Sequence, residues 1–346
     1  MMPSRRRLLM ALPGVSCALE GLARAGQRPA SSPARETRPG LQSFGIKAVG
    51  RTWNTVVHVP AKDPGKPMPV VLVLHGSGGD GASMLERTRW IRKADENGFL
   101  AVAPDAYPQD PARGPDFLTN PRMWNAGQFD PDSPRAAIDD VAFFRVLLDE
   151  LPRHYRIDES RIYVAGHSNG AGMTFRLATE LSERFAAIAT VGSICWIKNP
   201  KVPKPMPTIF LSGMMDPLVP VRGGISVLPW GKRTTVPVAD TLDDWARALG
   251  CPPKPRVSER RENGMYFEYG PGRGGSLLAA HLIDGQGHNW PGGRSIVPGI
   301  LGPDNRRVDA TDMIWDFIRR YRRRGAAEKS RTPDGRTLEE PVLRIR

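Results

Sequence analysis

Cysteine is scarce in this chain of 346 residues, which contains only Cys17, Cys195 and Cys251. So few cysteines exclude a fold stapled by several disulfides, and none of the three stands in a CxxC pair or at metal-ligand spacing. A single bridge between Cys195 and Cys251 stays open, because it requires an oxidising compartment and Cα atoms within about 7 Å of each other. We therefore expect a fold held together by its apolar core, with no cofactor and no metal.

Long apolar runs are also missing. No stretch approaches the roughly 18 to 20 consecutive apolar residues of a membrane-spanning helix, so no membrane span is predicted. The 36 glycines and 34 prolines follow no repeat, and 40% of the residues are hydrophobic while 25% are charged. These proportions exclude collagen-like and wholly disordered chains and fit a globular protein.

Acidic residues are fewer than basic ones, 36 against 49, which gives a formal charge of +13. The excess lies at the two ends. Residues 1–40 contain seven arginines and two glutamates, residues 319–346 contain ten basic and four acidic side chains, and the part between is close to neutral. A nucleic-acid-binding protein concentrates basic residues on its folded body, so no nucleic-acid partner is expected.

The first 25 residues predict an export signal. The segment SRRRLLM (4–10) gives a charged head, an apolar stretch follows to Leu19, and Ala23-Arg24-Ala25 supplies a small-residue cleavage site. This order is typical of a signal peptide of the twin-arginine type, and it predicts a mature chain that starts near Gly26 in the periplasm or outside the cell. A basic amphipathic helix of the folded protein is the alternative, and a lipid anchor on Cys17 is disfavoured.

The rest of the chain divides into three parts. Residues 26–41 are rich in Pro, Ser and Arg and predict a disordered linker, and residues 323–346 predict a basic, disordered tail. Residues 42–322 alternate apolar runs with amphipathic stretches, which predicts one α/β domain with a mostly parallel central sheet and helices on both faces. The predicted strands are 44–58 (an edge pair), 69–75, 99–103, 161–165, 186–191, 208–211 and 277–283; the predicted helices are 83–97, one opening at Ser133-Pro134, 170–181, 240–249 and 310–321.

One segment of this domain predicts a catalytic nucleophile. The sequence Gly166-His167-Ser168-Asn169-Gly170 has the form G-x-S-x-G and lies between a predicted strand and a predicted helix. That context is what a nucleophile elbow requires, because its tight turn tolerates only small neighbours and presents the serine hydroxyl above a helix N-terminus. We therefore predict Ser168 as the nucleophile.

A serine hydroxyl needs a base, and histidine is the side chain suited to this at neutral pH. His288 is the preferred candidate, because it follows the last apolar strand in a glycine-rich loop, DGQGHNWPGG (284–293). The other histidines have simpler explanations in a strand, at a helix end or beside the serine in the elbow; they are His58, His75, His154, His167 and His281.

The acid of such a site is expected between the serine and the histidine in the chain, on a loop after a strand. Asp216 meets this condition directly after the predicted strand 208–211, although an Asp-Pro pair is also a common turn initiator. Asp240, Asp243 and Asp244 are weaker candidates because they fall on or at the start of a predicted helix.

Two backbone N–H groups are expected to stabilise the oxyanion that develops during ester cleavage. Asn169, which follows the nucleophile, supplies the first, and Ser77 or Gly78 in the loop HGSGG (75–79) supplies the second. A phosphate-binding loop is the competing interpretation of these glycines, but the Lys-Ser/Thr pair of a P-loop and the GxGxxG pattern are both missing.

Six short segments, in order, resemble the secreted polyhydroxybutyrate depolymerase and feruloyl or acetylxylan esterase group of the α/β-hydrolase superfamily. They are His75-Gly76, Trp124-Asn125, Asp139-Asp140-Val141, GHSNG (166–170), Asp216-Pro217 and GHNWPGG (287–293). The resemblance covers residues 42–322 and implies an α/β-hydrolase fold, the triad Ser168, Asp216 and His288, and Trp124 and Trp290 beside the substrate. Met214-Met215 departs from the pattern usual before the acid.

The sequence thus predicts an exported serine esterase acting on a small or polymeric ester, of the polyhydroxybutyrate type or an acyl group on plant polysaccharide. A catalytically inactive binding module of the same fold is the first alternative, and a peptidase or lipase is the second. Asp139 and Asp140 could be a catalytic carboxylate pair, but acidic residues at a helix start are the simpler interpretation. The oligomeric state is left open.

Overall fold

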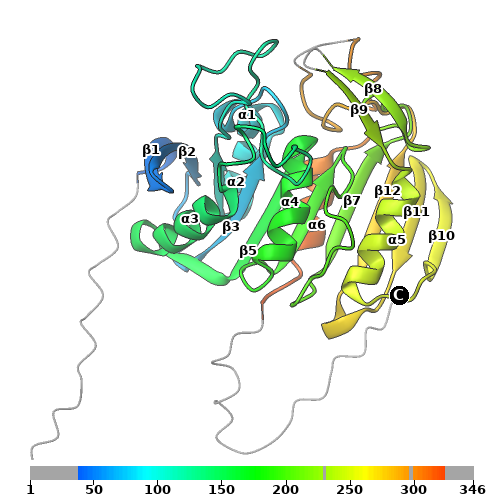
Figure 1. Cartoon of the computed structure of the whole chain (residues 1–346). Helices are drawn as coiled ribbons and strands as arrows, with labels where there is room; N and C mark the ends of the chain where they lie inside the picture. The colour runs from blue at the N-terminus through cyan, green and yellow to red at the C-terminus, as the bar shows by residue number, and fades with distance from the viewer. Residues whose placement is uncertain (1–37, 229–230, 296–298, 324–346) are drawn as a thin grey trace, which may run out of the picture. The chain divides into compact units, whose positions relative to one another are not determined.

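The predicted alternation of strands and helices is present in the computed structural model, which describes residues 38–228, 231–295 and 299–323. In these residues ten strands form one sheet in the order β1-β2-β4-β3-β5-β6-β7-β12-β11-β10 (Figure 1). Their bounds are β1 Gly40–Ala48, β2 Arg51–Val59, β3 Met68–Leu74, β4 Leu100–Pro104, β5 Ile157–His167, β6 Ala187–Val191, β7 Thr208–Gly213, β10 Val257–Arg261, β11 Gly264–Tyr269 and β12 Leu278–Ile283.

The centre of the sheet is parallel and its edges are antiparallel. Strands β4, β3, β5, β6, β7 and β12 run in the same direction. The pairs β1–β2 and β2–β4 on one side, and β12–β11 and β11–β10 on the other, are antiparallel. The carboxyl ends of the six parallel strands therefore meet at one edge, where loops from distant parts of the chain can build a site.

Helices cover both faces of the sheet, as predicted. Helices α3 (Asp140–His154), α4 (Asn169–Glu180) and α5 (Val238–Leu249) pack on one face, and α1 (Gly81–Arg87), α2 (Trp90–Asn97) and α6 (Ala310–Ile318) pack on the other (Figure 1). Strand β3 contacts both layers, because Val70, Leu72 and Leu74 join the first and Val71 and Val73 join the second. This double burial explains its continuous apolar run.

The single helix predicted over 83–97 is wrong, because two helices occupy that region. Arg89 lies between them with φ 64°, a left-handed conformation that interrupts the helical ladder. The hydroxyl of Thr88 donates to the backbone carbonyl of Met84 at 2.5 Å, so this carbonyl in the last turn of α1 has a hydrogen-bond partner. The predicted stop at Gly98 is confirmed, since this residue caps α2 with φ 69°.

Helix α3 starts later than predicted. Asp139 is its N-cap and accepts from the N–H of Ala142 at 2.9 Å, whereas Ser133 belongs to the preceding loop. The Ser133 hydroxyl oxygen accepts only from the Ala136 N–H, at 3.3 Å, within a local turn. The buried face of α3 includes Val141, Phe144, Leu148 and Leu151.

A two-stranded hairpin after β7 has no counterpart among the predicted elements. Strands β8 (Gly224–Leu228) and β9 (Gly231–Thr235) pair antiparallel and form a sheet of their own. Figure 1 shows this hairpin at the top right, at the edge where the parallel strands end. It therefore stands beside the predicted position of Asp216.

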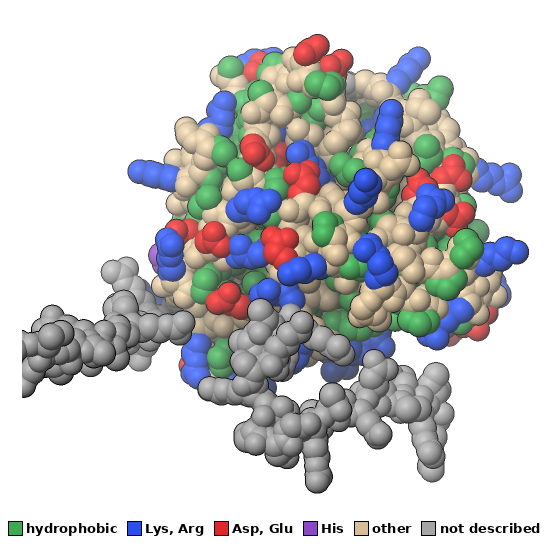
Figure 2. Space-filling model, turned by 60° about the horizontal axis from the view of Figure 1, so that its bottom comes forward, with side chains coloured by type: hydrophobic (Ala, Val, Ile, Leu, Met, Phe, Trp, Pro, Cys, Tyr) green, Lys and Arg blue, Asp and Glu red, His purple; other side chains and the backbone are tan. Residues whose placement is uncertain are grey.

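The surface carries charges of both signs. On the face drawn in Figure 2, lysine and arginine side chains alternate with aspartate, glutamate and apolar side chains, with no continuous basic area. No helix of the described residues is long and apolar enough to cross a membrane.

Candidate active site

Ser168 occupies a sharp turn between β5 and α4. Its backbone has φ 53° and ψ −120°, and its N–H donates to the carbonyl of Val191 at 2.8 Å. A side chain at Gly166 would come within 2.2 Å of the carbonyl oxygen of Gly170, and one at Gly170 within 2.4 Å of that of Leu74. Glycines on both sides thus permit this strained turn, which is the geometry of a nucleophile elbow.

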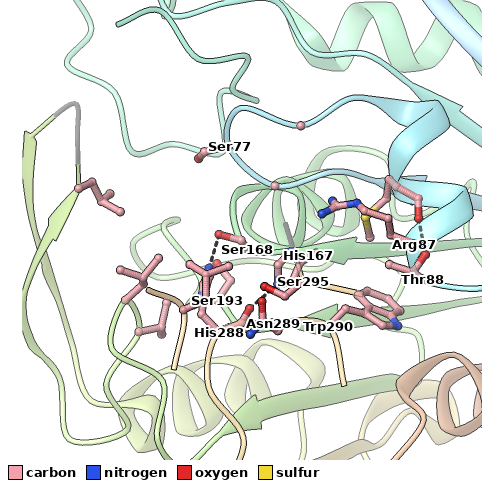
Figure 3. A pocket seen from close by; sticks show the side chains of 18 of the residues that line it. Ser77, Arg87, Thr88, His167, Ser168, Ser193, His288, Asn289, Trp290 and Ser295 are labelled. Atoms are coloured by element: carbon pink, nitrogen blue, oxygen red, sulfur yellow. Dashed lines mark hydrogen bonds between the residues drawn. The ribbon is translucent and has the colours of Figure 1, made fainter. Parts of the chain in front are cut away.

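His288 and Asp216 form a hydrogen-bonded chain with Ser168. The Nε2 atom of His288 lies 2.8 Å from the Ser168 hydroxyl, and its Nδ1 atom lies 2.8 Å from Oδ2 of Asp216. Since a carboxylate only accepts, the proton of a neutral His288 ring lies on Nδ1 and Nε2 faces the hydroxyl as an acceptor. The structure brings together the three side chains predicted as nucleophile, base and acid. Figure 3 shows the hydrogen bond between Ser168 and His288.

Asp216 is held by its own loop as well as by the histidine. Its Oδ1 atom accepts from the N–H groups of Leu218 and Val219, both at 2.8 Å, and only 4% of the residue is exposed. Burial alone would raise its pKa, but attraction to His288 and these hydrogen bonds outweigh burial and hold the pKa below its usual value. The carboxylate is therefore ionised and fixed.

The loop that carries Asp216 and the loop that carries His288 lie close together at the end of β7. A Cβ atom on Gly213, the last residue of β7, would lie 2.2 Å from the carbonyl oxygen of Gln286, which belongs to the His288 loop. A glycine at the end of β7 thus lets the loop of Asp216 and the loop of His288 approach each other.

The three candidate oxyanion donors differ in whether their backbone N–H group is already hydrogen-bonded. Within the described chain no protein acceptor takes the N–H groups of Asn169 and Ser77, and Ser77 lines the cavity beside Ser168. The N–H of Gly78, by contrast, donates to the carbonyl of Arg122 at 2.8 Å. Of the two residues that the sequence left open, the structure therefore favours Ser77 and removes Gly78.

Trp124 does not contact the cavity, so its prediction as a substrate-binding residue is corrected. Its side chain has no exposed surface, and its ring packs 5.3 Å from the rings of both Phe144 and His75, measured between centroids. Its backbone is paired with the side chain of Asn169, whose Oδ1 accepts from the Trp124 N–H at 2.6 Å while Nδ2 donates to the carbonyl at 2.9 Å. Trp124 thus anchors the residue that follows Ser168.

Trp290, the second predicted aromatic, does line the cavity. It is 5% exposed, and its indole N–H donates to the hydroxyl of Thr311 at 3.0 Å. The cavity has a volume of about 100 Å³. Besides the residues already named, its lining includes Gly76, Met84, Arg87, Phe117, His167, Gly192, Ser193, Leu228, Arg233 and Leu301.

His167 lies against His288, although the sequence suggested that its side chain only points away from the nucleophile. Its Nε2 atom lies 2.7 Å from the backbone carbonyl of His288, and this atom carries the proton because a carbonyl only accepts. Burial, with repulsion from His288, lowers the pKa of His167 to about 3. A neutral His167 therefore fixes the backbone that carries the predicted base.

Asp139 and Asp140 serve the fold and do not reach the cavity. Asp139 caps α3, and Asp140 is fully buried with both carboxylate oxygens 2.7 Å from Nη2 of Arg135. Asp140 also accepts from the N–H of Asn125 at 2.9 Å, and Asn125 follows Trp124 in the chain. This ion pair supports the loop that anchors Asn169.

In the described part of the chain, the cysteines form no disulfide and the acidic residues form no metal-binding group. Cys195 is partly buried and Cys251 is buried, and both thiols are free. Across the described ranges, no group of three or more His, Cys, Asp or Glu side chains is placed to hold a metal ion. Cys17, the predicted export signal and, apart from Arg323, the predicted tail lie outside the described residues.

Sequence reasoning missed several lining residues. Gly192 and Ser193 directly follow β6, and their position after a parallel strand was a usable signal. Leu228 and Arg233 belong to the hairpin, whose two strands have five residues each and are mostly exposed. In β8 the polar Ser226 is buried while Ile225 and Val227 are exposed, the reverse of the pattern that predicts a strand. Their place beside Ser168 depends on how that hairpin folds over the sheet edge.

Comparison with known proteins places this geometry in context. A family model described as phospholipase/carboxylesterase matches residues 55–231. NocK of Nocardia uniformis subsp. tsuyamanensis, which carries the name of an esterase, is 29% identical over 79% of this chain and 81% of its own length. Feruloyl esterase B of Piromyces equi is 25% identical over 74% of this chain and 42% of its own length, so the chain spans less than half of that enzyme.

Among solved structures, an acetyl xylan esterase from Aspergillus awamori matches 81% of this chain and 98% of its own with a TM-score of 0.53 and 14% identity. That likeness shows the α/β-hydrolase fold. The resemblance predicted from the sequence segments, to depolymerases and to feruloyl and acetylxylan esterases, is confirmed by the relatives found.

Proposed function

The chain belongs to the phospholipase/carboxylesterase family, and from this premise we propose that it is a serine esterase with Ser168 as nucleophile, His288 as base and Asp216 as acid. Membership of the family and the esterase names of its relatives support hydrolysis of a carboxylic ester. The single observation that carries the assignment of residues is the continuous hydrogen-bonded chain Ser168–His288–Asp216, with both distances at 2.8 Å.

In the proposed mechanism, the Ser168 hydroxyl attacks the ester carbonyl carbon while Nε2 of His288 takes its proton. The tetrahedral intermediate collapses, the C–O bond to the alcohol breaks, and His288 returns the proton to the leaving alcohol oxygen. Water then attacks the acyl-enzyme in the same way and releases the acid and free Ser168. Asp216 keeps the Nδ1 proton in place and stabilises the imidazolium that forms in each step.

In this mechanism the backbone N–H groups of Asn169 and Ser77 donate hydrogen bonds to the carbonyl oxygen as it becomes negatively charged. Both belong to backbone fixed before substrate binds, because the Asn169 side chain is bonded to Trp124 and the loop after β3 is held through His75. The His75 ring accepts from the Ala106 N–H at 3.0 Å, and its own Nδ1 proton faces the carbonyl of Gly76 at 2.7 Å. Preorganised donors of this kind stabilise the transition state without a cost of rearrangement.

Candidate substrates follow from the relatives' names and from the sequence resemblance. We propose an ester of the polyhydroxybutyrate type or an acyl group on plant polysaccharide, both of which present a carboxylic ester to an open cavity. Trp290 offers an aromatic edge to either class. An inactive binding module is less well supported, because the three side chains keep the hydrogen-bonded geometry that catalysis requires.

The test is hydrolysis of a short 4-nitrophenyl ester by the purified protein and by its Ser168→Ala variant. Loss of a nucleophile of this type lowers turnover on the order of a millionfold, so the variant should show no rate above background. Ser258→Ala is the matched control, because Ser258 is an exposed residue of the edge strand β10. Normal turnover in a folded Ser168→Ala protein would contradict the proposal, and inactivity of the wild type on every ester tried would favour a binding module.

We propose further that the protein is exported. The proposal rests on the twin-arginine pattern at Arg5 and Arg6 and on the cleavage site before Gly26. Mass spectrometry of the periplasmic or secreted protein should find a mature N-terminus near Gly26, and substitution of both arginines by lysine should block translocation. Exported protein that still begins at Met1 would contradict the predicted cleavage.

A further inference from the structure

The cavity that holds Ser168 is lined by cationic side chains and by no acidic one. Arg87, Arg233 and Arg294 all belong to its lining, and the described lining residues include neither aspartate nor glutamate. The three arginines come from separate elements: the end of α1, strand β9 and the loop after His288. Such an arrangement gives the cavity a positive potential, since concave walls of low dielectric concentrate the field of one sign of charge.

Arg87 points from α1 into the cavity (Figure 3). Its Nε donates to the carbonyl of Ser83 at 3.3 Å, and in the described residues no carboxylate lies within 4.0 Å of its guanidinium. Asp80, whose charge acts on Arg87, is occupied as the N-cap of α1 and accepts from the Ser83 N–H at 2.8 Å. Burial lowers the pKa of Arg87, which still leaves the side chain a cation at every physiological pH.

Arg233 lines the cavity from strand β9 of the hairpin, and this hairpin faces α1 across the cavity (Figure 3). Its guanidinium carbon is 5.0 Å from the ring centre of Trp196, a cation–π contact that holds the side chain without neutralising it. No carboxylate of the described chain forms an ion pair with it, and burial lowers its pKa. Arg233 is therefore a second cation whose charge is uncompensated.

Arg294 differs from the other two arginines because it already has a partner. Its Nη2 lies 2.6 Å from a carboxylate oxygen of Glu86, and 70% of its side chain is exposed. Its charge is largely balanced and screened, so it contributes little to the cavity.

Two guanidinium groups that line one cavity and form no ion pair within the described chain favour a substrate that brings an anion. A guanidinium group can donate two parallel hydrogen bonds to the two oxygens of a carboxylate. Hydrogen bonds between charged partners are stronger than those between neutral partners, and a partly buried cavity strengthens them further. We infer that the preferred substrate is an ester that also bears a free carboxylate, held by Arg87 and Arg233, such as a short oligoester with a free acid end. This inference rests on the proposed esterase function and narrows its substrate class.

Two pairs of esters, each matched in length and different by one charge, test the inference. In the first pair the carboxylate is on the acyl side: mono-4-nitrophenyl adipate against the same ester with the acid blocked as its N-methyl amide. In the second pair it is on the alcohol side: 3-acetoxybutyrate against its N-methyl amide. We expect kcat/KM to be about tenfold or more higher for the charged member of at least one pair. Added NaCl should reduce this preference by screening.

Variants connect the preference to the two arginines. Arg87→Met and Arg233→Met should each reduce the ratio of kcat/KM between the charged and blocked esters, mainly through KM, and Arg87→Lys should keep part of the preference because it retains the charge. Arg247→Met is the matched control, since Arg247 lies on α5 outside the cavity lining with 70% of its side chain exposed. Circular dichroism establishes that each variant is folded.

The outcomes separate the inference from the function on which it rests. Equal kcat/KM for both members of both pairs, or a preference that neither arginine variant alters, would overturn the inference while the esterase function stands. If the wild type hydrolysed none of the four esters, the esterase function would fail. Calorimetric titration with N-methyladipamic acid still tests the arginines in that case: binding lost in the Arg87→Met/Arg233→Met double variant supports them, and undiminished binding contradicts them.

Discussion

Single residues decide whether the turn at Ser168 can form. A serine at φ 53° is in a conformation that side chains rarely adopt, and it persists only because its surroundings hold it there. Gly170 is one of those surroundings, because its α-carbon faces the carbonyl oxygens of Leu74 and His75 at the end of β3. The contact joins the nucleophile turn to the loop that carries Ser77.

Gly170→Ala should therefore damage both stability and activity. The added methyl would lie 2.4 Å from the Leu74 oxygen and 2.6 Å from that of His75, so the backbone must move. Overpacking of this kind costs about 1–3 kcal/mol of unfolding free energy or more. Urea denaturation and ester hydrolysis measure the two effects. Gly114→Ala is the control, because no atom lies within 4 Å of its added methyl group, and equal behaviour of both variants would contradict the prediction.

Asp216→Asn should lower kcat with little effect on substrate binding. An amide can donate to Nδ1 and so favour the wrong tautomer of His288, and it cannot stabilise the imidazolium; in a triad this costs about 10⁴-fold in kcat. Steady-state kinetics of the variant measures kcat and KM, and a thermal midpoint equal to that of the wild type establishes that the variant is folded. Near-normal kcat would mean that Asp216 is not the acid, and the unusual Met214-Met215 before it would be the first place to reconsider.

At the scale of elements, helix α3 supports the site from a distance. Its first turn holds Asp139 as cap and Asp140 as the buried partner of Arg135, and Asp140 also holds the N–H of Asn125. Through Trp124 and the side chain of Asn169, this helix start is connected to the nucleophile turn. Loss of the Asp139 carboxylate and loss of the Asp140 carboxylate should therefore have different effects on the free energy of unfolding.

Asp139→Ala should cost about 1 kcal/mol of unfolding free energy, the usual value of an N-cap, and leave kcat/KM unchanged. Asp140→Ala should cost more, about 3–5 kcal/mol, because it leaves the guanidinium of Arg135 buried without its counterion. Chemical denaturation of the two variants side by side measures the difference. A large loss of kcat in a fully folded Asp139→Ala protein would restore the idea of a catalytic carboxylate pair.

On the scale of the whole molecule, neutral histidines that are wholly or partly buried make the fold sensitive to acid. Burial lowers the pKa of His281 to about 4 and also that of His75, and His167 lies at about 3 as described. In the unfolded chain these rings titrate near about 6.5. Below that pH the unfolded state binds more protons than the folded state, so the free energy of unfolding falls as the pH falls.

The unfolding free energy should thus be highest above about pH 6.5 and decline toward pH 4, by up to about 1.4 kcal/mol per pH unit for each such histidine. Urea denaturation at pH 7.0, 6.0 and 5.0 measures this slope, and it should be smaller in His281→Gln, since glutamine does not titrate. A flat profile between pH 7 and pH 5 would contradict the neutral state of these rings.

The sequence by itself determined the elements and the chemistry-bearing segments. Apolar periodicity predicted the order of strands and helices, and G-x-S-x-G between a strand and a helix predicted the turn at Ser168, because both signals are local and depend on a few neighbouring side chains. The carboxyl ends of parallel strands predicted the region where Asp216 and His288 would lie. The split at Arg89 and the late start of α3 escaped prediction, because tertiary hydrogen bonds and caps decided between local alternatives.

Only the tertiary structure decided which candidates meet. Asp216 and His288 are 72 residues apart in the chain, and their contact depends on how β7 and β12 pair and on the close approach at Gly213. The same packing buried Trp124, engaged Gly78 with Arg122 and brought Arg87 and Arg233 to the lining of one cavity. A sequence pattern fixes which face of its own element a side chain lies on, whereas its neighbours come from elements far along the chain, so these placements follow from packing alone.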